Sequence, residues 1–241
     1  TKTAAHAYYI HAPIQNNPRK HNISGASELK NGEADSRMDS QGLSSVIVIV
    51  FSELGDKTFF IAALMAMQHA KSSVIVGAFS ANVVMTVLSA MVGSMASVLQ
   101  KSHTHYLSVF LLLLFGARMI AEGYTMNEAD EKSIIKDAEA ETTQSSSYLV
   151  KLAGNSGLAQ TFFLIFVGEW GDRSQITTIA MAANEGIARV LIGAILGHGL
   201  CVCVAVYGGQ LVAHKLSIRS VTFLGGFVFL LFAISSVLMG P

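Results

Sequence analysis

Six long apolar stretches occupy most of the chain after residue 42. A helix that crosses a bilayer needs about 20 predominantly apolar residues, and six segments reach that length: 43–68, 73–99, 106–125, 157–183, 187–213 and 218–239. Only 13% of the 241 residues are charged, against about 25% in a soluble domain. With a net charge of zero, these features argue against a soluble protein or a nucleic-acid binder. They predict an all-α polytopic membrane protein with six transmembrane helices.

Polar segments divide the chain around these stretches. Residues 1–41 are polar and without periodicity, which predicts a flexible tail. The chain opens at Thr1 rather than methionine, which indicates a processed form or a fragment. Residues 127–152 are rich in acids and predict a solvated, partly helical linker. This linker separates two three-helix halves, 42–126 and 153–241.

The distribution of basic residues predicts the orientation. Six crossings place both chain ends on one side of the membrane and the linker on the other. The linker side carries the larger set of bases: Lys71, Lys132, Lys136, Lys151, Lys215 and Arg219. The positive-inside rule therefore predicts a cytosolic linker and termini that lie in a lumen or outside the cell.

The two halves share a motif at an offset of 116 residues. Residues 53–58 read Glu-Leu-Gly-Asp-Lys-Thr, and residues 169–174 read Glu-Trp-Gly-Asp-Arg-Ser. Over 51–79 against 167–195, eight positions are identical without a gap. Because each half has an odd number of predicted spans, the second must insert upside down relative to the first. The sequence thus predicts two inverted three-helix repeats, the layout of many secondary transporters.

Each motif lies near the middle of its apolar stretch, so six ionisable side chains fall near the membrane centre. Left ionised in lipid, they would cost on the order of 15–20 kcal/mol. Ion pairs from each glutamate to the base four residues later would compensate one acid per base but leave both aspartates unpaired. Four acids against two bases leave a formal charge of −2, which a divalent cation or two protons would neutralise. The residues concerned are the acids Glu53, Asp56, Glu169 and Asp172 and the bases Lys57 and Arg173.

Oxygen ligands of this kind suit hard divalent cations such as Ca²⁺, Mn²⁺ and Mg²⁺. The hydroxyls of Thr58 and Ser174 point away from the acids in a regular helix, but a break at Gly55 and Gly171 would turn them inward. A carboxylate must lose its proton to bind a metal, so cations and protons compete for the same groups. Such competition at one alternately exposed site is sufficient for cation/proton exchange.

Other polar residues near the motifs are supporting candidates. His198 falls on Asn82 at the 116-residue offset, so each half carries a polar group at this point of its second span, and His198 is a candidate proton relay. Gln175 adds polarity to the second half. Arg118 and Glu122 are predicted to form an i,i+4 pair near the end of the third span.

The two motifs resemble the paired signatures of the transmembrane protein 165 family, also called uncharacterised protein family 0016. The resemblance extends over about residues 43–239 and includes the acidic central segment. It implies a Golgi-type transporter, without a cofactor, that exchanges Ca²⁺ or Mn²⁺ for protons; other endomembranes and plastids are alternative locations. By resemblance, the cation-binding acids are Glu53, Asp56, Glu169 and Asp172, with Thr58 and Ser174 as hydroxyl ligands.

Three other functions are weighed against exchange. A passive divalent cation channel or uniporter would use the same acids without moving protons. An intramembrane aspartyl protease of the Gly-x-Gly-Asp type would be an enzyme, but Glu53 and Glu169 stand where the first glycine should be. A scaffold protein would tolerate loss of both motif aspartates. The sequence therefore favours a transporter over an enzyme.

Overall fold

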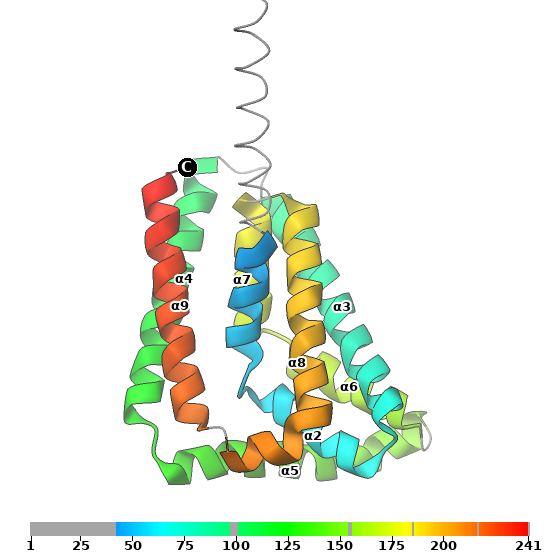
Figure 1. Cartoon of the computed structure of the whole chain (residues 1–241). Helices are drawn as coiled ribbons and strands as arrows, with labels where there is room; N and C mark the ends of the chain where they lie inside the picture. The colour runs from blue at the N-terminus through cyan, green and yellow to red at the C-terminus, as the bar shows by residue number, and fades with distance from the viewer. Residues whose placement is uncertain (1–41, 97–100, 154–155, 185, 216, 241) are drawn as a thin grey trace, which may run out of the picture. The chain divides into compact units, whose positions relative to one another are not determined.

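The computed structural model describes residues 42–96, 101–153, 156–184, 186–215 and 217–240, and all regular structure within them is helical. Figure 1 shows the arrangement. An apolar helix, Gly42–Glu53, is followed by α2 (Lys57–Gln68), α3 (Lys71–Ala96), α4 (Lys101–Thr125), α5 (Glu128–Ala153), α6 (Gly157–Gly168), α7 (Arg173–Asn184), α8 (Ile187–Lys215) and α9 (Ile218–Met239). The all-helical class is confirmed, whereas the predicted tail 1–41 lies outside the described residues.

Among the described residues, four helices are long and apolar enough to cross a membrane: Lys71–Ala96, Ser102–Thr125, Ile187–Gly208 and Ile218–Leu238. Large apolar side chains on these helices point outward, as for Phe110 and Leu231, which are 58% and 65% exposed. Water would not favour such faces, but lipid does. These features are those of a polytopic membrane protein.

The other two predicted spans are each divided into two shorter helices. Stretch 43–68 forms the Gly42–Glu53 helix and α2, and stretch 157–183 forms α6 and α7. In each case the interruption falls inside the repeated motif. None of these four short helices can cross a bilayer alone, since α2, α6 and α7 have 12 residues each and the Gly42–Glu53 helix is equally short.

Corresponding helices begin at the same offset in the two halves. Helix α2 begins at Lys57 and α7 at Arg173, and α3 begins at Lys71 and α8 at Ile187, which reproduces the 116-residue spacing. Helices α3 and α8 run in opposite directions, as do α4 and α9 (Figure 1).

The two halves interlock through close helix contacts. A Cβ atom on Gly77 of α3 would lie 2.5 Å from the carbonyl oxygen of Leu158 in α6. In the other half, a Cβ on Gly193 of α8 would lie 2.5 Å from the carbonyl oxygen of Gly42. Only glycine permits these approaches. Each of the two helices is thereby packed against a broken helix of the opposite half.

Helix α5 is the acidic central segment, and it is helical throughout its length. It packs against α2 and α6, and Ala138 and Thr142 are buried there. The Glu131 carboxylate accepts hydrogen bonds from the Ser217 hydroxyl and the Arg219 amide, both at 2.9 Å. The segment predicted to be a solvated, partly helical linker is thus a continuous helix, and one face of it packs against the bundle.

Candidate cation site

The site is built where the two broken helices are interrupted. Gly55 and Gly171 adopt positive φ angles of 84° and 82°, a region open to glycine and costly for other residues. The same turn closes each break, since the amide of the aspartate donates to the carbonyl of the glutamate: Asp56 to Glu53 at 3.1 Å and Asp172 to Glu169 at 3.2 Å. The helix break raised in the sequence analysis is present at both glycines.

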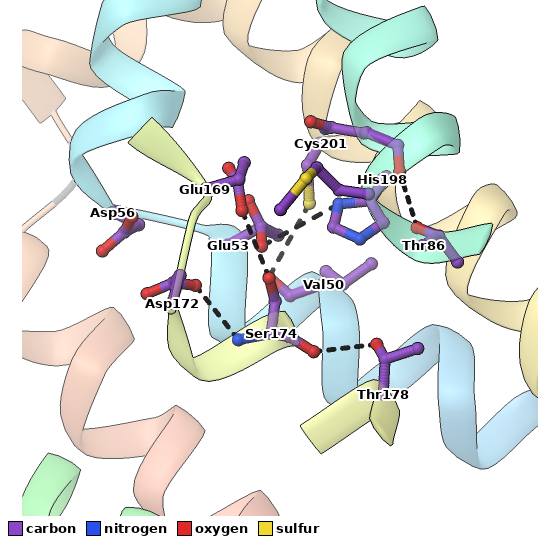
Figure 2. Close-up of polar contacts among 12 residues, drawn as sticks. Val50, Glu53, Asp56, Thr86, Glu169, Asp172, Ser174, Thr178, His198 and Cys201 are labelled. Carbon is purple, nitrogen blue, oxygen red and sulfur yellow. Dashed lines mark hydrogen bonds and ion pairs between the residues drawn. The ribbon is translucent and has the colours of Figure 1, made fainter. Parts of the chain in front are cut away.

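Three of the four motif carboxylates converge. Glu53, Glu169 and Asp172 each offer an oxygen that lies within 4.8 Å of the others. Figure 2 shows this cluster, with Asp56 set apart from it. Glu53 and Glu169 are only 3% and 2% exposed, so their charges have almost no contact with solvent. Unless protonated, such a cluster needs a cation.

Hydrogen bonds hold the cluster in place from α7. The Ser174 hydroxyl donates to Glu169 Oε2 at 3.3 Å, and the Ser174 amide donates to Asp172 Oδ2 at 3.0 Å. Asp172 thus caps the N-terminus of α7. The break turns the hydroxyl of Ser174 toward the acids, where the sequence placed a candidate ligand.

The fourth acid, Asp56, is engaged by a base from the other motif. Arg173 Nη2 lies 3.1 Å from Asp56 Oδ1, and Arg173 Nη1 lies 3.7 Å from Glu122 Oε2 in α4. Glu122 also accepts from Arg118 Nε at 2.6 Å, as predicted for that i,i+4 pair. Asp56 therefore belongs to an alternating row of acids and bases beside the cluster.

The local ion pairs considered from the sequence do not form. Lys57 pairs with Glu141 of α5 rather than with Glu53, and Arg173 pairs with Asp56 and Glu122 rather than with Glu169. The helix breaks abolish the regular i,i+4 spacing on which those pairs depended. Asp56 is also not left unpaired, so the hypothesis is corrected for the two local pairs and for Asp56.

Polar groups from α3 and α8 complete the surroundings of the cluster. His198 Nδ1 lies 3.8 Å from Glu53 Oε1, and Asn82 is buried on the facing helix. Among the described residues, Glu53 Oε1, Glu169 Oε1, Asn82 Oδ1 and His198 Nδ1 make no hydrogen bond. Buried polar atoms rarely lack partners, so this concentration indicates a place for a polar ligand.

A small cavity lies against Glu53, Asn82 and Glu169. Its volume is about 10 Å³, roughly the space of one water-sized sphere. Its polar lining comes from Glu53, Thr58, Asn82, Glu169 and Cys201. Thr58 is buried there, whereas Gln175 lies elsewhere and accepts a hydrogen bond from the Gly171 amide at 2.6 Å. Gln175 thus supports the second break rather than the cluster.

A larger cavity of about 500 Å³ adjoins Asp172. Both motif loops and residues of α4, α5, α7 and α9 line it, among them Asp56, Glu122, Asp137, Asp172 and Arg173. Because Asp172 belongs to the carboxylate cluster and also lines this larger cavity, it connects the cluster to the cavity.

Sequence reasoning missed two residues of this region, Glu122 as a partner of Arg173 and Glu141 as a partner of Lys57. Glu122 was assigned only to its local pair with Arg118, and Glu141 to a solvated linker. No spacing in the sequence connects either residue to a motif, since both contacts depend on packing between helices.

The fold and the carboxylate site define an integral membrane protein of the ion-transport class. The sequence profile described as divalent cation/proton antiporter GDT1 matches residues 42–127 and 157–240. The chain therefore belongs to the GDT1 family of divalent cation/proton antiporters, and the resemblance seen in its motifs is confirmed.

Individual relatives cover most of the chain. It is 40% identical over 205 residues to GDT1-like protein 3 of Oryza sativa subsp. indica, with 82% of this chain and 74% of the relative covered. It is 38% identical over 194 residues to GDT1-like protein sll0615 of Synechocystis, with 80% and 94% covered. It is 36% identical over 227 residues to the divalent cation/proton antiporter GDT1 of Saccharomyces cerevisiae, with 80% and 81% covered. No solved structure matches.

Proposed function

We propose that this protein exchanges Ca²⁺ or Mn²⁺ for protons, two protons for one cation, by alternating access to the carboxylate cluster. The observation that carries the proposal is the meeting of Glu53, Glu169 and Asp172, with oxygens within 4.8 Å of one another, at the junction of two broken helices. Four acids were expected to form the site; three of them meet in this structure, and Asp56 lies beside them with Arg173.

The chemistry of the cluster supports a hard divalent cation as the cargo. The surrounding atoms are mainly carboxylate, hydroxyl and amide oxygens, the ligands that Ca²⁺ and Mn²⁺ accept. Both glutamates stand at or beside the C-terminal ends of helices, Gly42–Glu53 and α6, where the helix dipole favours a positive charge. When the cation leaves, protons on the same carboxylates replace its charge.

The arrangement of the halves supports alternating access. We infer six membrane crossings, in which each broken helix pair counts as one crossing. The repeated helix bounds and the opposite directions of corresponding helices (Figure 1) support two inverted repeats. In transporters of this design, one half rocks against the other around a site near the bilayer midplane. The large cavity beside Asp172 would then be the path to one side of the membrane.

We further propose that the protein resides in the Golgi or a related endomembrane, with the α5 end in the cytosol and the termini in the lumen. The side of the protein that carries α5 has more lysine and arginine residues than the opposite side, which supports this orientation.

Transport by purified protein in liposomes tests the function. A trapped pH dye and a cation indicator would be read while Mn²⁺ or Ca²⁺ is added outside. The wild type is expected to take up cations as lumenal protons leave, and Glu53→Gln and Glu169→Gln are expected to abolish both signals. Glu139→Gln on the exposed face of α5 makes the same chemical change away from the site and should keep both.

The alternatives give different traces. Cation entry without proton movement, with the membrane potential clamped, would point to a channel or uniporter. Equal exchange by wild type and both glutamine variants would show that the cluster is not the site. Exchange that reverses with membrane potential would refute the electroneutral ratio. Size-exclusion profiles would establish that each variant is folded.

A further inference from the structure

The two motifs carry the same charges but use them differently. At the 116-residue offset, Asp56 corresponds to Asp172 and Lys57 to Arg173. Arg173 of the second motif pairs with Asp56 of the first at 3.1 Å. The counterpart of this contact would join Lys57 to Asp172. Among the described residues that pair does not occur, because Lys57 is bound to Glu141.

This difference decides which aspartate joins the two glutamates. Asp56 is neutralised by Arg173 and stays outside the cluster. Asp172 has no ion pair among the described residues and supplies the third carboxylate beside Glu53 and Glu169. In this structure, the aspartate that joins the cluster is the one whose counterpart base, Lys57, is bound outside the motifs.

Each base has a second carboxylate outside the motifs. Glu141 of α5 holds Lys57. Glu122 of α4 lies 3.7 Å from Arg173 but is bound more closely by Arg118, at 2.6 Å. Arg173 thus pairs mainly with Asp56, and Glu122 lies next to it as an alternative partner. Lys57 is thus paired with a carboxylate outside the motifs, whereas Arg173 is paired with the aspartate of the other motif.

We propose that Glu141 and Glu122 are positioning residues that select the third carboxylate of the cation site, an inference that rests on the proposed exchange. With Lys57 on Glu141 and Arg173 on Asp56, the site consists of Glu53, Glu169 and Asp172 and faces the large cavity. In the opposite-facing state, Lys57 moves to Asp172 and Arg173 moves to Glu122. Asp56 is then released and replaces Asp172 in the site.

The exchange of partners keeps the charge of the centre constant. In either state three of the four motif carboxylates bind the cation, and the fourth carboxylate is paired with a base. The protein therefore never places an unpaired fourth acid in the membrane interior, where an uncompensated charge is strongly unfavourable. Two related motifs, with Glu141 and Glu122 as carboxylate partners outside them, are sufficient for this exchange of partners.

The proposal predicts effects on opposite faces of the membrane. In Glu141→Gln, Lys57 is released and competes for Asp172, so the half-saturating Mn²⁺ concentration should rise about 10–100-fold at the α5 face and stay unchanged at the other face. In Glu122→Gln, Arg173 lacks its alternative partner, so the rise should occur at the face opposite α5. Proteoliposomes of one orientation, measured for influx and for efflux, report the two faces separately.

A second substitution separates competition from structural support. If Lys57 weakens the site in Glu141→Gln by competing for Asp172, then adding Lys57→Gln removes the competitor and should restore affinity at the α5 face. If the Lys57–Glu141 ion pair only stabilises the fold, the double variant should be no better than Glu141→Gln. Glu139→Gln is the matched control on α5 and should resemble the wild type.

The outcomes distinguish this inference from the proposed function. Absence of coupled flux in the wild type would overturn the function itself. Normal wild-type exchange, with equal effects of Glu141→Gln on both faces or no restoration by Lys57→Gln, would overturn the selection of the third carboxylate alone. If Glu141→Gln does not fold, Glu122→Gln gives an independent test, and an equal change at both faces would again contradict the proposal.

Discussion

Replacement of Gly171 by alanine tests the origin of the helix break at the site. Gly171 has a φ of 82°, and a Cβ added to it would meet no atom within 4 Å. The cost of the substitution is therefore conformational rather than steric. An L-residue in this region loses about 1–2 kcal/mol. For a domain of this size, that loss corresponds to a fall in Tm of about 2–8 °C.

Thermal unfolding in detergent, followed by circular dichroism or intrinsic fluorescence, measures this fall. Gly42→Ala is the matched control, because its added Cβ also meets no atom within 4 Å and Gly42 has no positive φ. Gly171→Asn should lie between glycine and alanine, since asparagine adopts positive φ more readily. An alanine variant as stable as the wild type, or a Gly42→Ala variant equally destabilised, would refute the assignment of the cost to the backbone of the break.

Further predictions concern packing, ligands and pH. Gly77→Ala places a Cβ 2.5 Å from a backbone carbonyl of α6, so it should cost about 1–3 kcal/mol in unfolding free energy; an unchanged Tm would contradict this contact. Asn184→Ala removes hydrogen bonds that the side-chain amide donates from α7 to α4 and should cost about 1–3 kcal/mol, whereas Asn184→Asp, which has no donor for these oxygens, should be no more stable than the alanine variant in the same melting assay. Ser174→Ala removes the hydroxyl 3.3 Å from Glu169 and should raise the half-saturating Mn²⁺ concentration about tenfold; Ser174→Thr should not, and equal effects of both would count against the hydroxyl. Apparent Mn²⁺ affinity should fall as pH falls, because protons compete for the carboxylates, and pH-independent binding in a titration would exclude that competition.

The membrane class and the position of the helix breaks could be predicted because they depend on local properties of the chain. Hydropathy over about 20 residues reports whether a helix suits lipid, and all four continuous spans were recovered in this way. The glycine between the two acids of each motif indicated a break, since glycine alone adopts the required φ without strain. The offset of 116 residues likewise anticipated equivalent helix starts at Lys57 and Arg173.

The membership of the site was predictable only in part. Glu53, Glu169 and Asp172 were candidate ligands, and they converge. Asp56 has the same sequence context as Asp172, yet it lies with Arg173 outside the cluster. Two motifs with the same pattern of charges cannot reveal this difference, because it depends on which other helix supplies a partner to each base.

The sequence by itself determined which residue types lie inside the membrane and where the chain can bend, because composition and backbone preference act over a few residues. Only the tertiary structure decided how the charges pair. Side chains such as Lys57 and Arg173 reach across helix boundaries, so their partners, Glu141, Asp56 and Glu122, are distant in sequence. Electrostatic pairing depends on distance in space, and that distance is established only when the helices have packed.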